Sequence, residues 1–247
     1  GYWNKILRIN LTDASINVEQ VTDDLWKFCI GGAGYGAKVL LEEVTAKTKA
    51  FDSNNKIIYA TGAYNAGNNP GNGKWSAVSI SPLTETHCDT AGTGDFGVKL
   101  KRAGFDAIVV EGKSDKPVYI YVEDGKAEIK DAKDIWGLDT YSIKDAINKI
   151  EEKKDITTAG IGLAGENLVK YACIVVDGHS FAGRGGLGAV MGSKKLKAVA
   201  IRGTLKPIIA NEKGLKEFAK VKFKEIYDEA LKNGLREHGT SLYCTPL

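Results

Sequence analysis

The stretch Ala91–Gly112, AGTGDFGVKLKRAGFDAIVVEG, decides the fold because the chain repeats it 91 residues further on. The second copy, Ala182–Gly203, reads AGRGGLGAVMGSKKLKAVAIRG and aligns without a gap. The identical pairs are Ala91/Ala182, Gly92/Gly183, Gly94/Gly185, Gly97/Gly188, Ala107/Ala198 and Gly112/Gly203. Each copy has a G-x-G-x-x-G turn, a helix-like stretch and an apolar strand closed by glycine. We therefore expect two related halves.

Composition is that of an ordinary globular protein and argues against several classes of function. Of the 247 residues, 26% are charged and 43% hydrophobic, and the net charge is +3. Such a small charge does not favour a nucleic-acid partner. No apolar run reaches the ~18 residues that a membrane span needs, and no signal peptide opens the chain. We expect a cytoplasmic protein without nucleic-acid or membrane partners.

The cysteines and histidines do not form a recognisable catalytic or metal-binding pattern. The cysteines at 29, 88, 173 and 244 stand far apart, and none belongs to a C-x-x-C pair. The sequence therefore shows no zinc or iron–sulfur signature. His87 and His179 each precede a glycine turn, so both a ligand contact and an ordinary loop hydrogen bond remain open. No catalytic residue and no metal ligand is assigned.

Periodic patterns predict the remaining elements. Strands are expected at 5–10, 15–21, 56–61, 75–81, 106–111, 117–122, 126–130, 155–161 and 169–176. Helices are expected at 23–28, 37–44, 95–103, after Asp139 or Thr140, and from the cap residue Asn211 to about 233. Hairpins outnumber β-α-β units, which favours an α+β fold: an internally duplicated unit with mixed or antiparallel sheets and packed helices.

These elements suggest the domain boundaries. We expect a duplicated cofactor-binding domain over residues 1–210, with halves at about 50–131 and 150–210. Residues 211–247 are expected to form a helix and the start of a further domain. A Gly- and Asn-rich loop near 68–74 gives the first half about seven more residues than the second.

The two glycine turns are candidate anion sites. A helix N-terminus has free N–H groups and partial positive charge, and glycine lets a phosphate approach the backbone. Cations lie near both turns, including Lys74 and Arg184. The turns predict two phosphate-bearing ligands, or one ligand with two phosphate arms. The alternative is that the glycines only permit close packing of helix on sheet.

A nicotinamide dinucleotide site is a further alternative. Glu111 lies about 20 residues after Gly92, where a ribose-binding acid is expected in a dinucleotide-binding fold. However, the second copy has Arg202 at that position, and the segment 84–91 before the first turn is too polar to be read as a strand. The spacing alone therefore does not favour this alternative.

Several segments together resemble the start of the tungsten-containing aldehyde:ferredoxin oxidoreductases. They include NKILRINL at 4–11, AGFDAIVVEGK at 103–113, IGLAGENLVK at 161–170 and AGRGGLGAVMGSKKLKA at 182–198. The resemblance covers about residues 3–210. It implies an internally duplicated N-terminal domain that forms the base of a bis-pyranopterin (tungstopterin) site, with tungsten or molybdenum and with magnesium between the pterin phosphates.

The resemblance also implies the function of the full enzyme. That enzyme oxidises aldehydes to carboxylic acids and passes electrons through a [4Fe–4S] cluster to ferredoxin. Its cluster cysteines and catalytic residues lie in C-terminal domains beyond residue 247, which would be partners of this chain, and a homodimer is compatible with the family. The chain alone would then be an inactive fragment. The alternative is a non-catalytic structural or assembly module that keeps the fold.

The family's cofactor contacts carry over by position. The first set is Lys74, Ala91, Gly92, Thr93 and Gly94, and the second is Ser180, Phe181, Gly183, Arg184, Gly185 and Gly186. Well-studied members have Arg in place of Lys74, Asn in place of Ala91 and Arg in place of Ser180. Lysine keeps the charge of arginine without its planar fork.

Overall fold

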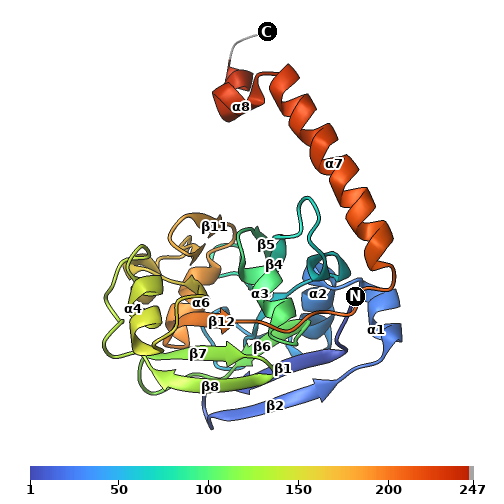
Figure 1. Cartoon of the computed structure of the whole chain (residues 1–247). Coiled ribbons are helices and arrows are strands. Elements are labelled where there is room, and N and C mark those ends of the chain that lie inside the picture. Colours follow the sequence, from blue (N-terminus) through green and yellow to red (C-terminus); the bar gives the residue numbers. More distant parts are fainter. Residues whose placement is uncertain (245–247) are drawn as a thin grey trace.

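The computed structural model describes residues 1–244 and contains two six-stranded sheets (Figure 1). The strand order is β2-β1-β6-β3-β4-β5 in the first sheet and β11-β10-β9-β12-β7-β8 in the second. When one order is reversed, the two correspond strand for strand. The expected α+β fold with a duplicated unit is confirmed, and the duplication extends to every strand.

Hairpins build most of each sheet, as the alternating patterns predict. The first sheet consists of β1 (Lys5–Asn10), β2 (Ser15–Gln20), β3 (Ile57–Ala60), β4 (Trp75–Ile80), β5 (His87–Gly92) and β6 (Ala107–Glu111). The second consists of β7 (Val118–Glu123), β8 (Lys126–Asp131), β9 (Thr157–Gly160), β10 (Ile174–Val176), β11 (Ser180–Ala182) and β12 (Leu196–Arg202). The pairs β1–β6 and β7–β12 are parallel, and the remaining pairs are antiparallel.

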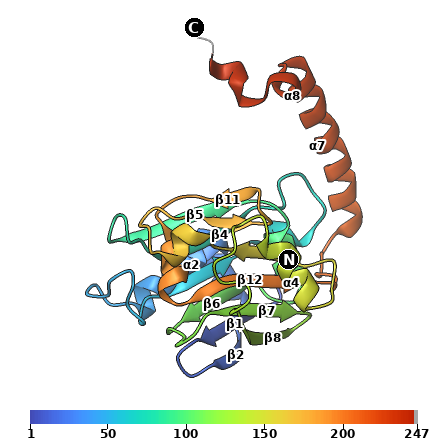
Figure 2. The same ribbon diagram turned by 90° about the vertical axis from the view of Figure 1, so that its left-hand side faces the viewer.

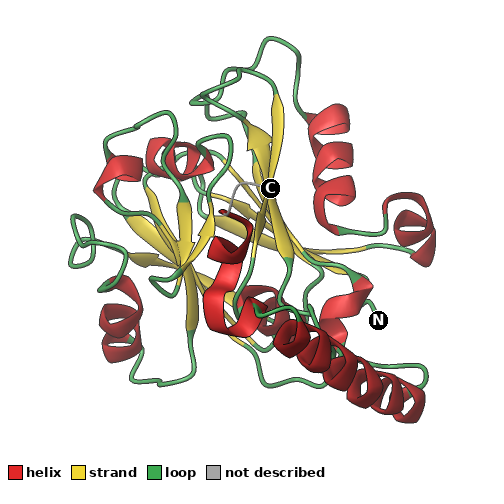
Figure 3. Cartoon of the chain, turned by 90° about the horizontal axis from the view of Figure 1, so that it is seen from above, coloured by secondary structure: helices red, strands yellow, loops and turns green. Residues whose placement is uncertain are grey.

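Helices cover the outer sides of the sheets and fill the space between them (Figure 3). The α-helices are α1 (Asp23–Cys29), α2 (Gly32–Glu43), α3 (Phe96–Arg102), α4 (Ile143–Ile150), α5 (Leu163–Glu166), α6 (Leu187–Ser193), α7 (Glu212–Lys232) and α8 (Leu235–His238). Two 3-10 turns, η1 (Ala63–Ala66) and η2 (Gly239–Cys244), complete the described elements. Helix α2 packs on β3 and β4, and α4 packs on β9.

One central core joins the two halves. Helix α3 of the first half contacts β9 and β12, and α6 of the second half contacts β3 and β4. The core holds fully buried apolar side chains from both sheets and both helices, among them Tyr59, Phe96, Ile120, Met191 and Val199. Because each half covers apolar surface of the other, burial stabilises the halves jointly.

Several elements differ from the sequence-based expectation, and β11, α5 and η1 were not predicted at all. The polar segment before the first glycine turn contains strand β5, which lies at a sheet edge with His87, Asp89 and Ala91 exposed. Helix α2 begins at Gly32 instead of residue 37 and includes glycines that were expected to precede it. The strand expected at 169–176 is only Ile174–Val176.

The sheets also divide the chain differently from the expected halves. The hairpin β7–β8, at 118–131, pairs with β12 and belongs to the second sheet. Strands of the first sheet begin at Lys5, long before residue 50. By strand content the halves are 5–111 and 118–202.

Helix α7 leaves the rest of the molecule and rises from its upper side (Figures 1 and 2). Asn211 caps it as predicted, accepting a hydrogen bond from the N–H of Gly214 at 2.8 Å, and it ends before Gly234, which has a φ of +70°. Near its start, a Cβ at Gly67 would lie 2.5 Å from Leu215, so the helix is seated on the Gly- and Asn-rich loop. The tail beyond it forms α8 and η2, and residues 245–247 lie outside the described part of the chain.

Candidate functional site

The two glycine turns lie next to each other, at the point where the sheet edges β5 and β11 meet. Thr93 Oγ1 lies 2.5 Å from Ser180 Oγ. The N–H of Arg184 donates to Thr90 Oγ1 at 3.1 Å. The sequence placed these turns 91 residues apart, and the fold brings them into direct contact across the boundary between the halves.

Each turn presents main-chain N–H groups without a partner. Within residues 1–244, no hydrogen bond engages the N–H of Thr93, Gly94 or Asp95 in the first turn. In the second turn the same is true of the N–H of Gly183, Gly185 and Gly186. Unpaired N–H groups in a turn with left-handed residues form a concave anion site. They are successive in the first turn, whereas in the second the N–H of Arg184, between Gly183 and Gly185, is engaged by Thr90. Helices α3 and α6 have only seven residues each. We therefore attribute the capacity to bind an anion to the N–H groups of the turns and not to a helix dipole.

Close packing fixes the glycines of the second turn. Gly185 and Gly186 have φ values of +68° and +70°, which side chains rarely adopt. A Cβ at Gly185 would overlap the sulfur of Cys88, and a Cβ at Gly186 would overlap the carbonyl of Lys170. The glycines are therefore needed for packing, and the same turns also leave their N–H groups unpaired. The packing and binding interpretations are thus compatible.

Each turn has one exposed cation of the predicted set, supplied by a different kind of element. Arg184 belongs to the second turn itself, whereas Lys74 belongs to the Gly- and Asn-rich loop, in which the neighbouring Gly73 packs against Gly94 of the first turn. Asn65, which is 4% exposed, orders this loop. Its Nδ2 donates to the carbonyls of Lys74, at 2.7 Å, and of Asn72, and its Oδ1 accepts from Gly62.

The other predicted residues surround the same contact. Gly92 is buried, and a Cβ there would overlap the Trp75 ring. Ala91 in β5 and Thr93 just after it are exposed, and Phe181 in β11 is 56% exposed. The hydroxyl of Ser180 is engaged by Thr93. Together with Lys74 and Arg184, these side chains would offer a ligand two positive charges, an aromatic ring and hydroxyl groups.

Sequence reasoning missed three residues that hold the turns. Thr90 accepts from Arg184, and Ser81 Oγ donates to the carbonyl of Gly185 at 2.6 Å. The indole Nε1 of Trp75 donates to the carbonyl of Thr93 at 3.3 Å. The sequence offers no signal for the first two, because their partners are about a hundred residues away and belong to the other half.

The histidines and the nearby cysteine are not part of a reactive cluster. His87 and His179 are exposed, and His179 Nδ1 lies 2.8 Å from the carbonyl oxygen of Asp177, an ordinary loop contact. Burial, followed by the charge of Asp89, raises the pKa of the Cys88 thiol. The residues described contain no group of three or more His, Cys, Asp or Glu that would hold a metal ion.

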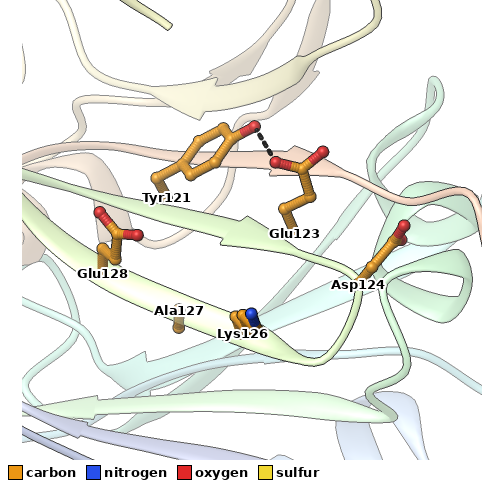
Figure 4. A pocket seen from close by; sticks show the side chains of 6 residues that line it. All are labelled: Tyr121, Glu123, Asp124, Lys126, Ala127 and Glu128. Carbon is orange, nitrogen blue, oxygen red and sulfur yellow. Dashed lines mark hydrogen bonds between the residues drawn. The ribbon is translucent and has the colours of Figure 1, made fainter.

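A separate pocket of about 350 Å³ lies along the β7–β8 hairpin (Figure 4). Tyr121, Glu123, Asp124, Lys126, Ala127 and Glu128 line it. The hydroxyl of Tyr121 donates to Glu123 at 2.9 Å, and Arg202 pairs with the same carboxylate. Asp124 holds the backbone of Thr204 at 2.8 Å. The carboxylates of Glu123 and Asp124 are thus engaged within the chain.

Comparison with known proteins agrees with this architecture. A sequence model described as "Aldehyde ferredoxin oxidoreductase, N-terminal domain" matches residues 6–203. The tungsten-containing aldehyde ferredoxin oxidoreductases of Pyrococcus abyssi and Pyrococcus furiosus are 40% identical over 98% of this chain and 40% of their own length. The aliphatic sulfonate oxidoreductase, WOR-like subunit, of Pyrococcus furiosus is 32% identical over 97% of this chain.

A solved structure has the same fold. The active site complex BamBC of benzoyl coenzyme A reductase, in complex with 1,5-dienoyl-CoA, superposes with a TM-score of 0.82 and 35% identity, over 85% of this chain and 32% of that one. The chain spans about two fifths of the length of the curated relatives it matches. Within the described residues, no helix is long and apolar enough to span a bilayer. The chain belongs to the aldehyde ferredoxin oxidoreductase N-terminal domain family.

Proposed function

We propose that this chain forms the base of a tungstopterin site, in which the two glycine turns hold the phosphate arms of a bis-pyranopterin cofactor. The observation that carries the proposal is the pair of adjacent turns whose N–H groups at Thr93–Asp95 and at Gly183, Gly185 and Gly186 have no partner within residues 1–244. Two contiguous anion cradles, related by duplication, match a ligand with two similar anionic arms. We call them the first and the second cradle.

The residues present fit such a ligand in number and in charge. Lys74 would accompany the arm in the first cradle and Arg184 the arm in the second, each as a positive partner for a phosphate. The N–H groups supply contacts that do not depend on the substituted side chains at Ala91 and Ser180. Magnesium between the two phosphates would relieve their mutual repulsion where the cradles meet.

The cofactor would supply oxygen-transfer and two-electron chemistry at its metal, and this chain would bind and orient it. In the full protein we propose aldehyde oxidation to the carboxylic acid, with a [4Fe–4S] cluster outside this chain and ferredoxin as electron acceptor. The names of the 40%-identical relatives support this proposal. Proteins named for aliphatic sulfonate and benzoyl-CoA chemistry carry a similar domain. Because their names point to different substrates, this supports a role of the domain in binding the cofactor and not in choosing the substrate.

The nicotinamide alternative loses support in the structure. Dinucleotides bind where a parallel strand runs into a glycine turn in a doubly wound sheet. Strand β5 does run into the first turn, but it is an edge strand paired antiparallel with β4 alone. The first turn therefore does not follow a parallel strand, as it does in this class of dinucleotide site.

Metal and pterin content test the proposal. The chain would be produced with tungstate, together with the C-terminal three fifths of a relative, and the purified complex analysed for tungsten and for pterin fluorescence. We expect both, and a substantial loss of both in the Lys74→Ala, Arg184→Ala double variant. A complex that assembles without tungsten or pterin would refute the assignment and favour a non-catalytic assembly module.

A further inference from the structure

Side chains of the first half hold the second cradle in place. Thr90 Oγ1 accepts from the N–H of Arg184 at 3.1 Å, and Ser81 Oγ donates to the carbonyl of Gly185 at 2.6 Å. Thr90 is 1% exposed and Ser81 is fully buried. Buried hydroxyls are nearly always hydrogen-bonded, because burial removes them from water. Two consecutive residues of the second cradle are thus fixed by the other half of the chain.

Steric contacts reinforce this dependence. The sulfur of Cys88 occupies the space beside Gly185 that a Cβ would need. The ring of Pro82 would lie 3.2 Å from a Cβ at Gly186. Strand β5 and the turn that precedes it therefore form one wall of the second cradle.

The first cradle depends on the second half in the same way. Ser180 Oγ lies 2.5 Å from Thr93 Oγ1. At Gly94, whose φ is +81°, a Cβ would lie 3.3 Å from Val176 and 3.7 Å from Ser180. The contacts are approximately reciprocal, as expected at a two-fold interface, since Thr93 and Arg184 occupy equivalent positions of the repeat and each contacts the edge strand of the opposite half.

We propose that the two cradles are cross-braced, so that Thr90 and Ser81 of the first half are positioning residues for the second cradle and Ser180 of the second half positions the first. The proposal rests on the proposed function, because it concerns the same anion-binding turns. It implies that a change in one half lowers the anion affinity of the cradle in the other half.

The variant Thr90→Val tests this directly. Valine preserves the shape and the strand preference of threonine but removes the oxygen that accepts from Arg184. The measurement is a titration of the isotope-labelled chain with inorganic phosphate, followed through the amide resonances of Gly94 in the first cradle and Gly185 in the second. Because each cradle has its own glycine amides, the two affinities are measured separately in one experiment.

We expect Thr90→Val to weaken phosphate binding about three- to tenfold at Gly185, the effect of one lost hydrogen bond, with Gly94 changed less than twofold. Thr90→Ser, which keeps the hydroxyl, should restore the affinity at Gly185. The matched control is Thr61→Val, which removes an equally buried hydroxyl that donates to Asp106 within the first half. Both cradles should keep their affinity in that control.

The outcomes separate the two proposals. If phosphate shifts the amide resonance of neither Gly94 nor Gly185 in the unmodified chain, the turns do not bind phosphate and the proposed function is refuted. Cross-bracing is refuted if phosphate shifts both amide resonances but Thr90→Val lowers the phosphate affinity measured at Gly94, or lowers it at neither glycine. If Thr90→Val does not fold, Ser81→Ala replaces it and should likewise lower the phosphate affinity measured at Gly185. Ser180→Ala should lower the phosphate affinity measured at Gly94.

Discussion

The Nζ of Lys194 lies 2.9 Å from the carbonyl oxygen of Gly112, in a fully enclosed position between the halves. It also donates to the carbonyls of Asn55, at 2.5 Å, and Ser53, at 3.3 Å. Two of these carbonyls belong to the first half and the third, of Gly112, to the segment that follows it; together they bind the ammonium group of a residue that directly follows α6 of the second half. Burial, followed by repulsion from Lys56, lowers the pKa of Lys194 to about 8.

Replacing Lys194 with Met should change how stability depends on pH. The pKa of Lys194 is lower in the folded chain than in the unfolded chain, so the unfolded chain binds more protons between pH 8 and pH 10.5. The free energy of unfolding of the unmodified chain, relative to Lys194→Met, should therefore rise by about 3 kcal/mol across that range. Urea unfolding of both chains at several pH values measures the difference. A difference that is constant with pH would show that Lys194 has the same pKa in the folded chain as in the unfolded chain.

The ion pair between Lys101 and Asp106 should be costly to break from one side. Both side chains are fully buried, and Asp106 also accepts from the N–H of Trp3 at 2.9 Å. Asp106→Ala leaves a buried cation without its partner, so we expect a loss of about 3–5 kcal/mol in the free energy of unfolding. Replacing both with apolar residues, as Lys101→Met and Asp106→Leu, should lose less than the single variant. Chemical denaturation of the single and double variants measures this, and the exposed pair Glu212–Lys216 is the control, whose removal should leave stability unchanged.

Gly185→Ala should disable the second cradle by steric overlap. The added methyl group meets the sulfur of Cys88, in a backbone conformation that also disfavours alanine. We expect a lower melting temperature and loss of the phosphate response at the second cradle. Cys88→Ala in the same chain should restore part of the melting temperature, because it removes the overlapping sulfur but not the backbone penalty. A complete recovery would show that the φ of Gly185 carries no cost.

Asn65→Ala should detach Lys74 from the first cradle. The side-chain amide holds the carbonyls of Lys74 and Asn72, and both would lose a buried donor. We expect a loss of about 1–3 kcal/mol in the free energy of unfolding, together with weaker phosphate binding at Gly94 and not at Gly185. Equal weakening at both cradles would indicate general loosening of the fold.

Lys74→Arg should strengthen the first cradle. A guanidinium offers a planar pair of donors to a phosphate, whereas an ammonium acts as a point charge. We expect phosphate affinity at Gly94 to rise about two- to fivefold, with the second cradle unchanged as an internal reference. Amide shifts in the phosphate titration report both. No gain would mean that the side chain at 74 points away from the bound anion.

The sequence predicted the strands and helices that have a strong period and missed those that do not. The hairpin at β1–β2 and the cap at Asn211 follow from local pattern and local hydrogen bonding. Strand β5 was missed because an edge strand with one exposed face can be polar, and here Asp89 and His87 face solvent. Gly32 and Gly34 were expected to lie outside a helix, but packing of α2 on β4 overrides their low helix propensity.

The candidate site was predicted in its composition but not in its assembly. The repeat identified both glycine turns, because positions with positive φ or close backbone contacts require glycine, and glycine is visible in the sequence. The contact of Thr93 with Ser180, and the role of Thr90, depend on how two six-stranded sheets are placed against each other. That placement comes from the shared core around α3 and α6, and no local pattern encodes it.

The shared core also determines whether either half of the chain can fold without the other. Each sheet comes from one continuous stretch of chain, and the two stretches are joined through the short segment 112–117. A polypeptide cut in that segment would yield two fragments, each with a large uncovered apolar face complementary to the other. We expect such fragments to reassociate into the intact fold when mixed, while neither folds by itself. The duplicated halves are then obligate partners that happen to share one polypeptide.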